Sequence, residues 1–389
     1  MLRGNTTGMD RTVFTAEHEQ FRDAFARFCE TEIVPFHGEW ESAGVVPRSL
    51  WEKAGAAGFL CPFLPEELGG SGADFRYSAV MIEELARCRA SGPAFPLHSD
   101  ICAPYIASFG NDEQRRRWLP GTASGEKILA IAMTEPDAGS DLAGIRTTAR
   151  RDGDSYVLNG QKTFISNGQI CDLVIVCAKT APDSDPPHAG MSLFVVEDGT
   201  PGFEKGRNLV KLGLKAQDTS EMSFSDCVVP RENLLGEEGS GFYYLMDKLQ
   251  QERLVVALGC AATAAAVLAD GVAYCKERKA FGKPISKLQN LQFRLAELAT
   301  EVEIGRVFVD RLLAAHVAGD QVVSEVSMAK WWVSEQLKRT CDEVLQFHGG
   351  YGYMMEYPIA RDYLDARIQT IFAGTTEVMK LIIARQMGL

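Results

Sequence analysis

The feature that most constrains the fold is a double change in the spacing of apolar residues along the chain. In the N-terminal part they recur every three or four positions, as Phe21, Phe25 and Phe28 do, which predicts helices. After Lys127 short β-prone runs replace this pattern, and from Gly241 onward long Ala-, Leu- and Val-rich helical stretches return. This order of helices, strands and helices narrows the choice of folds, but it does not by itself identify any chemistry.

The expected elements follow from these spacings and from the Gly- and Pro-rich breaks between them. Helices are expected at about residues 17–33, 47–57, 75–88, 111–119, 244–278, 288–317, 325–347 and 376–387. Strands are expected at 173–178, 192–196 and 221–224. Residues 155–166 are expected to form a hairpin that turns at Asn159-Gly160, because both residues tolerate a positive φ.

A chain of 389 residues is long enough for two or three domains, each with its own core. We therefore expect a helical domain at residues 1–129, a compact β domain at 130–240 and a helical bundle at 241–389. The net charge of −12 argues against a nucleic-acid binder, although a local basic pocket for an anionic ligand remains compatible with it.

Several classes of protein are excluded by what the sequence lacks. Neither a long apolar run in residues 1–11 nor about 18 consecutive apolar residues anywhere is present, so we expect no secretory signal, no membrane span and a cytoplasmic protein. The ten cysteines include no C-x-x-C pair, so we expect free thiols in the core rather than disulfides or a metal site.

Three segments contain residues suited to binding a nucleotide-like ligand. Residues 132–141 (AMTEPDAGSD) combine small side chains and hydroxyls, which let a backbone approach a planar or phosphorylated ligand, although a plain capped turn has the same composition. Residues 346–353 (QFHGGYGY) have the glycine density of a nucleotide loop but follow a helix, so a Rossmann interpretation fails and a tight interhelical turn is the alternative. His348 is expected to be a structural hydrogen-bonding group rather than a base.

The third segment is residues 278–282 (RKAFG), with Gln289 following. Arg278 could reach a pyrophosphate and Phe281 could stack on an aromatic ring. As isolated residues, they would instead be a solvated charge and a core aromatic side chain.

Together these segments resemble the acyl-CoA dehydrogenase family over essentially the whole chain. Residues 132–141 match its middle-domain signature, and residues 346–353 match its C-terminal signature, including the spacing of Glu356, Arg361 and Asp365. Residues 371–378 (IFAGTTEV) look like its C-terminal flavin and substrate loop. The resemblance implies an α+β fold with an N-terminal helical domain, a barrel-like middle β-sheet domain and a C-terminal four-helix bundle.

The resemblance also implies an FAD site, shared across a subunit interface of a homotetramer that is a dimer of dimers. The residues implied beside the isoalloxazine are Ile131, Ala132, Met133, Thr134, Gly139, Ser140, Phe164, Ile165 and Ser166. Those implied at the adenine and pyrophosphate are Arg278, Phe281, Gln289, Gln346, Phe347, Gly349 and Gly350, and the flavin site is completed by Thr375, Thr376 and Glu377. The implied substrate contacts are Ser140, Gln250, Arg253, Phe372, Ala373 and Gly374.

The catalytic base is where the sequence departs from the commonest family pattern. Short- and medium-chain members carry it just before the Gly-Thr of the C-terminal loop, where this chain has Ala373, whose N–H could still serve the thioester oxygen. Long-chain and isovaleryl-type members place it on a helix just before an arginine, which here is Glu252 before Arg253. The alternative is a solvent-facing Glu–Arg helix pair; Glu377 and Glu135 are weaker candidates for the base.

The implied reaction is removal of the α-proton by Glu252 with hydride transfer from the β-carbon to the flavin, which gives a trans-2-enoyl-CoA in fatty-acid β-oxidation. An electron-transferring flavoprotein is the expected acceptor. Phe372 is bulky where isovaleryl-type members have glycine, which favours straight or long acyl groups. Two alternatives remain: an acyl group on a carrier protein, and a flavin monooxygenase or other non-dehydrogenase of the same fold. The residues leave acyl length, acceptor and pathway open.

Overall fold

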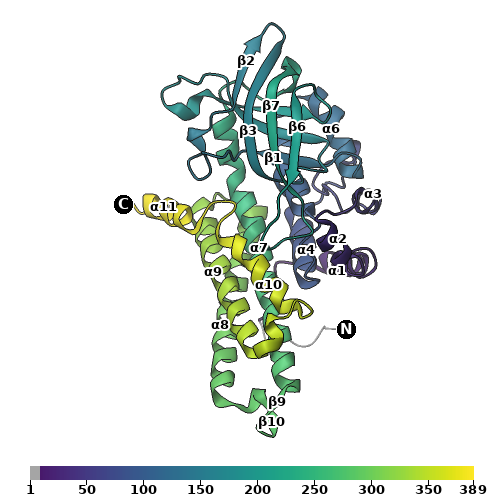
Figure 1. Ribbon diagram of the computed structural model, residues 1–389, viewed down its shortest axis with the longest axis vertical. Helices are drawn as coiled ribbons and strands as arrows, with labels where there is room; N and C mark the ends of the chain where they lie inside the picture. The colour runs from purple at the N-terminus through teal and green to yellow at the C-terminus, as the bar shows by residue number, and fades with distance from the viewer. Residues whose placement is uncertain (1–8) are drawn as a thin grey trace. The chain divides into compact units, whose positions relative to one another are not determined.

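The computed structural model describes residues 9–389. The expectation that residues 1–11 contain no secretory signal therefore falls mostly on residues outside the described range. The chain divides into two compact units (Figure 1). The helical unit contains the chain up to Glu30, Phe75–Ala90 and Arg253–Leu389, and the sheet unit contains Thr31–Asp74 and Ser91–Glu252. The three-domain boundaries expected from the sequence divide the chain differently, and they stay a prediction.

The helical unit is built from long amphipathic helices. Its helices are α1 (Ala16–Phe28), α4 (Phe75–Arg87), the larger part of α7 (Gly241–Glu277), α8 (Gln289–Val317), α9 (Val323–His348), α10 (Pro358–Ala366) and α11 (Thr376–Gln386). The two-residue strands β9 (Lys279–Ala280) and β10 (Lys283–Pro284) form a hairpin between α7 and α8 (Figure 1). The four helices expected after Gly241, at 244–278, 288–317, 325–347 and 376–387, are confirmed to within three residues at each end.

Helix α9 lies at the centre of this unit, where α8, α10 and α11 pack against it (Figure 1). Its buried residues Val326, Val333, Leu337 and Val344 recur at intervals of seven, four and seven residues, so they share one face. Helix α9 therefore provides the apolar stripe on which the neighbouring helices are held. Lys330 occupies a position on this same buried face.

The sheet unit combines short helices with one eight-stranded sheet. Its helices are α2 (His37–Ala43), α3 (Arg48–Ala56), α5 (Ala103–Phe109) and α6 (Asp112–Ser124), and a π-helical turn, Leu97–Cys102, precedes α5. Its strands are β1 (Leu129–Ala132), β2 (Thr148–Asp152), β3 (Ser155–Ser166), β4 (Leu173–Lys179), β5 (Met191–Glu197), β6 (Phe203–Asn208), β7 (Thr219–Pro230) and β8 (Leu234–Leu235). The strand order is β6-β7-β3-β2-β4-β5-β8, and β1 pairs with β4.

Strand β4 is buried on both faces, which explains its uninterrupted apolar sequence. Leu173 and Ile175 belong to the core that the sheet shares with α5 and α6. The alternate residues Val174 and Val176 belong to the core on the other face, together with side chains of β3 and β7. The sheet therefore supports helices on one side and closes a second core on the other.

The hairpin expected at Asn159-Gly160 is wrong. These residues lie inside the single strand β3, at an irregularity in its pairing with β7. Gly160 is needed there because a Cβ atom would lie 2.4 Å from Oγ1 of Thr147. The actual hairpin joins β2 to β3 and turns at Gly153-Asp154, where Gly153 has a φ of 59°.

Helix α7 is the one helix among residues 9–389 that is long and apolar enough to cross a membrane. Its most apolar 18-residue window has a mean hydropathy of 1.9, and 56% of that window is buried inside the protein. Core helices of soluble proteins share this length and composition, so neither property identifies a membrane span. The absence of a membrane span therefore stays a prediction.

Candidate active site

The segment 132–141 follows β1 in the sheet unit. Ile131 and Ala132 end β1, in parallel pairing with Ile175 and Val176 of β4. The chain then turns tightly, because the N–H of Glu135 donates to the carbonyl of Ala138 at 2.8 Å. Beyond the turn, Gly139 and Ser140 are exposed, and a Cβ atom at Gly139 would meet no atom within 4 Å. Small side chains thus face open space directly after a buried strand.

Strand β3 brings the second flavin segment expected from the sequence beside the first. The N–H of Thr163 donates to the carbonyl of Thr134 at 2.9 Å. The next residue, Phe164, has a φ of 60° and is 68% exposed, which is an unfavourable conformation for a bulky side chain. Ile165 is buried and Ser166 is half-buried. The structure therefore places segments 131–140 and 164–166 next to each other.

A buried ion pair fixes this arrangement. Nζ of Lys162 lies 2.8 Å from Oε1 of Glu135 and donates to the carbonyl of Met133 at 3.1 Å. The same carboxylate accepts from the backbone N–H groups of Arg146 and Thr147. Burial alone would raise the pKa of Glu135, but the Lys162 ammonium and these donors outweigh it and lower the pKa. A carboxylate held in this way anchors the loop and is a poor base.

Glu252, the last residue of the sheet unit, is buried on α7, with only 4% of its surface exposed. The hydroxyl of Tyr105, on α5, donates to its Oε1 at 2.6 Å. The adjacent Gln251 donates from Nε2 to the carbonyl of Asp100 at 2.6 Å, so this turn of α7 is tied to the π-helical turn as well. The burial of Glu252 contradicts the alternative of a solvent-facing Glu–Arg pair.

Two neighbours of the candidate base on α7, Gln250 and Arg253, are also buried. Gln250 lies on the sheet-unit part of α7. Arg253 begins the helical unit, where its guanidinium donates to Oγ of Ser327 at 3.4 Å. Since charged side chains are rarely buried without a role, Glu252 and Arg253 are both candidates for function.

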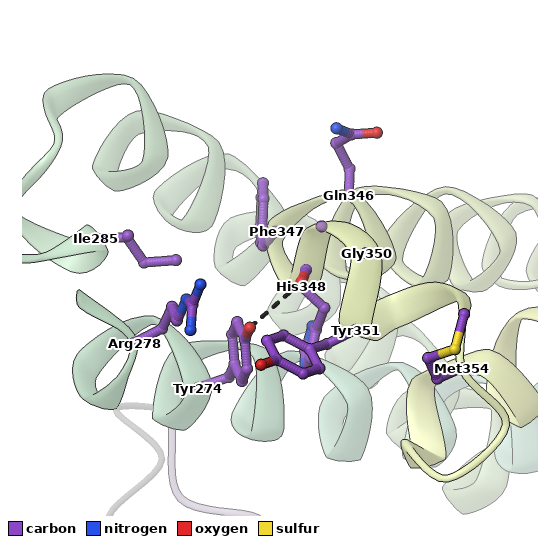
Figure 2. Close-up of a pocket in the computed structure, with 10 residues that line it drawn as sticks. Tyr274, Arg278, Ile285, Gln346, Phe347, His348, Gly350, Tyr351 and Met354 are labelled. Atoms are coloured by element: carbon purple, nitrogen blue, oxygen red, sulfur yellow. Dashed lines mark hydrogen bonds between the residues drawn. The ribbon is translucent and has the colours of Figure 1, made fainter. Parts of the chain in front are cut away.

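A pocket of about 470 Å³ lies in the helical unit, between the C-terminal ends of α7 and α9 (Figure 2). Its lining residues are Tyr274, Arg278, Ile285, Gln346, Phe347, His348, Gly349, Gly350, Tyr351 and Met354. The pocket thus unites two segments that are about 70 residues apart in the sequence, and both had been expected at the adenine and pyrophosphate. In Figure 2 the Gln346 side chain points away from the rings of Tyr274, His348 and Tyr351.

Aromatic stacking shapes the inner wall of this pocket. The rings of Tyr274 and His348 are stacked, with centroids 3.8 Å apart and planes inclined by 19°. Nδ1 of His348 lies 2.8 Å from the carbonyl of Val344, and burial lowers the pKa of its imidazole, which keeps the ring neutral near pH 7. The Arg278 guanidinium lies 5.3 Å from the ring centre of Tyr351. His348 therefore supports the pocket wall as a structural residue.

Two residues expected at the FAD site do not line this pocket. Phe281 is 92% exposed in the turn between β9 and β10, with a φ of 51°. Gln289 is exposed at the start of α8. Within the helical unit taken by itself, neither residue has a part in the pocket.

The loop before α11 is held by a buried lysine that the sequence analysis did not single out. Lys330 is fully buried on α9 and donates to the carbonyl of Gly374 at 2.6 Å. Burial lowers the pKa of Lys330 to about 8. Ala373, which precedes Gly374, has a φ of 51°, and the exposed Phe372 comes before it. Lys330 thus fixes the conformation of the loop at Ala373 and Gly374.

Thr375 and Thr376 join this loop to α11. The Thr375 hydroxyl accepts from the N–H of Val378 at 3.2 Å and so caps the helix. The Thr376 hydroxyl donates to Oε1 of Glu335 at 3.0 Å. Glu377 is exposed in the first turn, where backbone N–H donation lowers its pKa. Low basicity argues against Glu377 as the base.

Comparison with known proteins identifies relatives along the whole chain. Models of the N-terminal, middle and C-terminal domains of acyl-CoA dehydrogenase match residues 15–126, 130–227 and 239–388. The long-chain specific mitochondrial acyl-CoA dehydrogenase of Sus scrofa is 48% identical over 376 residues, which are 97% of this chain and 87% of that protein.

Solved structures agree with these matches. The crystal structure of acyl-CoA dehydrogenase from Geobacillus kaustophilus is 56% identical, with a TM-score of 0.97, and the match covers 98% of this chain and 100% of that chain. A chain in the structure of the electron transferring flavoprotein of Acidaminococcus fermentans is 37% identical, with a TM-score of 0.92, over 97% of this chain and 99% of that chain.

The fold expected from the resemblance, with helices at the N-terminus, a central sheet and a C-terminal helical bundle, is thereby confirmed. The chain belongs to the acyl-CoA dehydrogenase family of flavin-dependent oxidoreductases.

Proposed function

We propose that this protein catalyses the FAD-dependent α,β-dehydrogenation of an acyl-CoA thioester to the trans-2-enoyl-CoA, with Glu252 as the base. The observation that carries this proposal is the buried Glu252 carboxylate, held by Tyr105, in a chain that has alanine at position 373. An α-proton is weakly acidic, so its acceptor must lie in a dry pocket that raises its basicity. A carboxylate buried on a helix meets this requirement.

The residues of the α7–α9 pocket fit the pyrophosphate and adenine of FAD. Arg278 has no carboxylate within ion-pair distance among residues 9–389, so its charge is available to an anion. A Cβ atom at Gly349 or Gly350 would meet no atom within 4 Å, which leaves both backbones open to a ligand. FAD, when bound, accepts the hydride from the β-carbon of the substrate.

The chain's own residues would then bind and orient the thioester. Ala373 would donate its N–H to the thioester oxygen and stabilise the developing enolate. Its positive φ, next to the carbonyl that Lys330 holds, supports this role. Segments 131–140 and 164–166 would hold the isoalloxazine, with Ser140 also beside the acyl thioester, and Thr375–Glu377 would complete the flavin site.

We further propose a straight, long acyl chain as the substrate and an electron-transferring flavoprotein as the acceptor. Phe372, and the likeness to the long-chain specific enzyme of Sus scrofa, support the first proposal. The likeness to the Acidaminococcus fermentans structure supports the second. A cytoplasmic homotetramer, arranged as a dimer of dimers, remains a proposal from the sequence and the resemblance alone.

A panel of saturated acyl-CoAs, tested with the purified flavoprotein and a dye acceptor, would examine this function. We expect bleaching of FAD absorbance, dye reduction and a 2-enoyl-CoA product under anaerobic conditions. Turnover that requires oxygen would instead indicate a monooxygenase. Turnover only with acyl groups on a carrier protein would reassign the substrate. Protein that binds neither FAD nor FMN would contradict the proposal.

Arg278→Ala is expected to weaken FAD retention about tenfold or more. The lost charge-assisted hydrogen bonds to the pyrophosphate are worth about 1.5–3 kcal/mol. The measurement is flavin released on serial dilution, with the affinity for a thioester followed in parallel. Lys276→Ala, which removes an exposed cation in the last turn of α7, two residues before Arg278, is the matched control and should retain flavin. Equal retention in both variants would contradict the role of Arg278.

A further inference from the structure

Tyr105 places a hydroxyl deep in a largely apolar core. The side chain is fully buried, in a cluster that includes Cys102, Ile106 and Trp118. The Phe109 ring lies 6.2 Å from its own ring, and α5 meets the π-helical turn just before it. A phenylalanine would fill the same space with no polar group to satisfy. The hydroxyl therefore requires its own explanation.

That explanation lies in the partner of the hydroxyl. The Tyr105 hydroxyl donates to Oε1 of Glu252 at 2.6 Å, a short, charge-assisted hydrogen bond. Burial and the Glu252 carboxylate raise the pKa of Tyr105 well above its usual value, so the phenol keeps its proton. A phenol that always donates favours the ionised carboxylate and holds one of its oxygens in place.

Two buried thiols near Tyr105 leave the assignment unchanged. The thiols of Cys102, on the π-helical turn, and Cys177, on β4, lie close enough to interact with Tyr105. Burial raises the pKa of both thiols, to about 11 for Cys177, so both are neutral at pH 7. The next residue on α7, Arg253, donates to Ser327 in the helical unit. Tyr105 and Glu252 both belong to the sheet unit, so their hydrogen bond is fixed within that unit.

We propose that Tyr105 is a positioning residue that keeps Glu252 ionised and oriented, and so sets the pH above which the enzyme removes the α-proton. This inference rests on the proposed function of Glu252. It assigns to α5 a part in the reaction, through a hydrogen bond between residues 147 positions apart.

Tyr105→Phe in the FAD-loaded enzyme tests this inference. The rate of flavin reduction by palmitoyl-CoA is measured against pH under anaerobic conditions. Without the donor the ionised carboxylate is less stable, its pKa rises, and the acid limb of the profile moves up by about one to two pH units. On that limb the rate falls about 10- to 100-fold, and the two enzymes converge at high pH. A merely structural role would lower the rate equally at all pH values.

Incorporation of 3-fluorotyrosine at position 105 keeps the hydroxyl and should shift the acid limb of the pH profile in the opposite direction. The fluorinated phenol is more acidic and a stronger donor, so the acid limb should move down. Tyr156→Phe is the matched control, because the buried Tyr156 hydroxyl donates to Oε2 of Glu238 at 2.8 Å in the same unit. Its profile should equal that of the wild type.

Parallel measurement of Glu252→Gln tests the role of Glu252 separately from that of Tyr105. If Glu252→Gln reduces its flavin at the wild-type rate, the proposed function of Glu252 fails. If that variant is inactive while Tyr105→Phe and the fluorotyrosine enzyme both keep the wild-type profile, the inference on Tyr105 alone is overturned. Opposite shifts in the two Tyr105 variants would establish it.

Discussion

Glu252→Gln is expected to lower the rate of flavin reduction by substrate about 10²–10⁴-fold, the usual range for loss of a general base. Glutamine keeps the size of the side chain and can still accept a hydrogen bond from Tyr105, so the local packing is preserved. Flavin content and thioester affinity should therefore stay near those of the wild type. Rapid-mixing measurement of flavin bleaching with palmitoyl-CoA separates this chemical step from binding.

Asp247→Asn is the matched control for this variant. It also removes one negative charge from α7, but at an exposed position. Its rate of flavin reduction should remain within a factor of about two of the wild type, since surface charges contribute little. If Glu252→Gln also kept the wild-type rate, the helix-borne base would be wrong, and Glu377 and Glu135 would have to be tested in turn.

The long helices could be predicted because their apolar stripes are long enough to reveal a period. Strand β4 could be predicted from its uninterrupted apolar run. Strands β2 and β6 could not be predicted, because half or more of their side chains are exposed, so neither strand has a clear apolar pattern. The short helices α2 and α5 were missed because two turns give too few repeats to show a period.

Asn159-Gly160 failed as a hairpin signal for a different reason. The dipeptide reports a local tolerance of unusual φ values, and a bulge in a continuous strand uses that tolerance as well as a turn does. Which of the two forms depends on the distant Thr147, which comes close to Gly160. Local composition therefore could not decide between them.

Some residues of the candidate site could be predicted from local sequence motifs, and others depend on contacts with residues far away in the sequence. The segments that form the α7–α9 pocket were visible as motifs, whereas Tyr105 was not, because nothing near it in the sequence marks its contact with Glu252. Lys330 did leave a signal: it stands between Val326 and Val333 on the apolar face of a predicted helix. A lysine at a core position of a predicted helix indicates a buried, functional group.

Lys162→Met is expected to lower the free energy of unfolding of the sheet unit by about 3–5 kcal/mol at pH 7. The change leaves the Glu135 carboxylate buried without its cation, beneath the loop that continues to Gly139 and Ser140. Denaturant titration followed by circular dichroism measures the loss. Because loop 131–140 depends on this anchor, the variant should also release flavin more readily than the wild type.

The pH dependence of this loss has a definite sign. In the wild type the pKa of Glu135 is lowered, so the stability it contributes is present at neutral pH and disappears as the pH falls through that pKa. In Lys162→Met the carboxyl is buried without a cation, its pKa rises, and protonation on acidification relieves the penalty. The difference between the two proteins should therefore be largest at pH 7 and shrink as the pH approaches 4.

Two further variants distinguish the ion pair from the lysine side chain itself. Lys162→Met combined with Glu135→Leu removes both charges and should recover part of the stability that the single change loses. No ion is then left buried alone, although the N–H groups of Arg146 and Thr147 lose their acceptor. Lys53→Met breaks the exposed Lys53–Glu32 pair of the same unit, whose atoms are 2.6 Å apart, and should cost no more than about 1 kcal/mol. Equal losses in the single and double variants, with no dependence on pH, would show that Lys162 stabilises the unit by packing alone. In that case the loop 131–140 would not depend on the charge of Glu135, and its anchor would have to be sought in the backbone bond between Thr134 and Thr163.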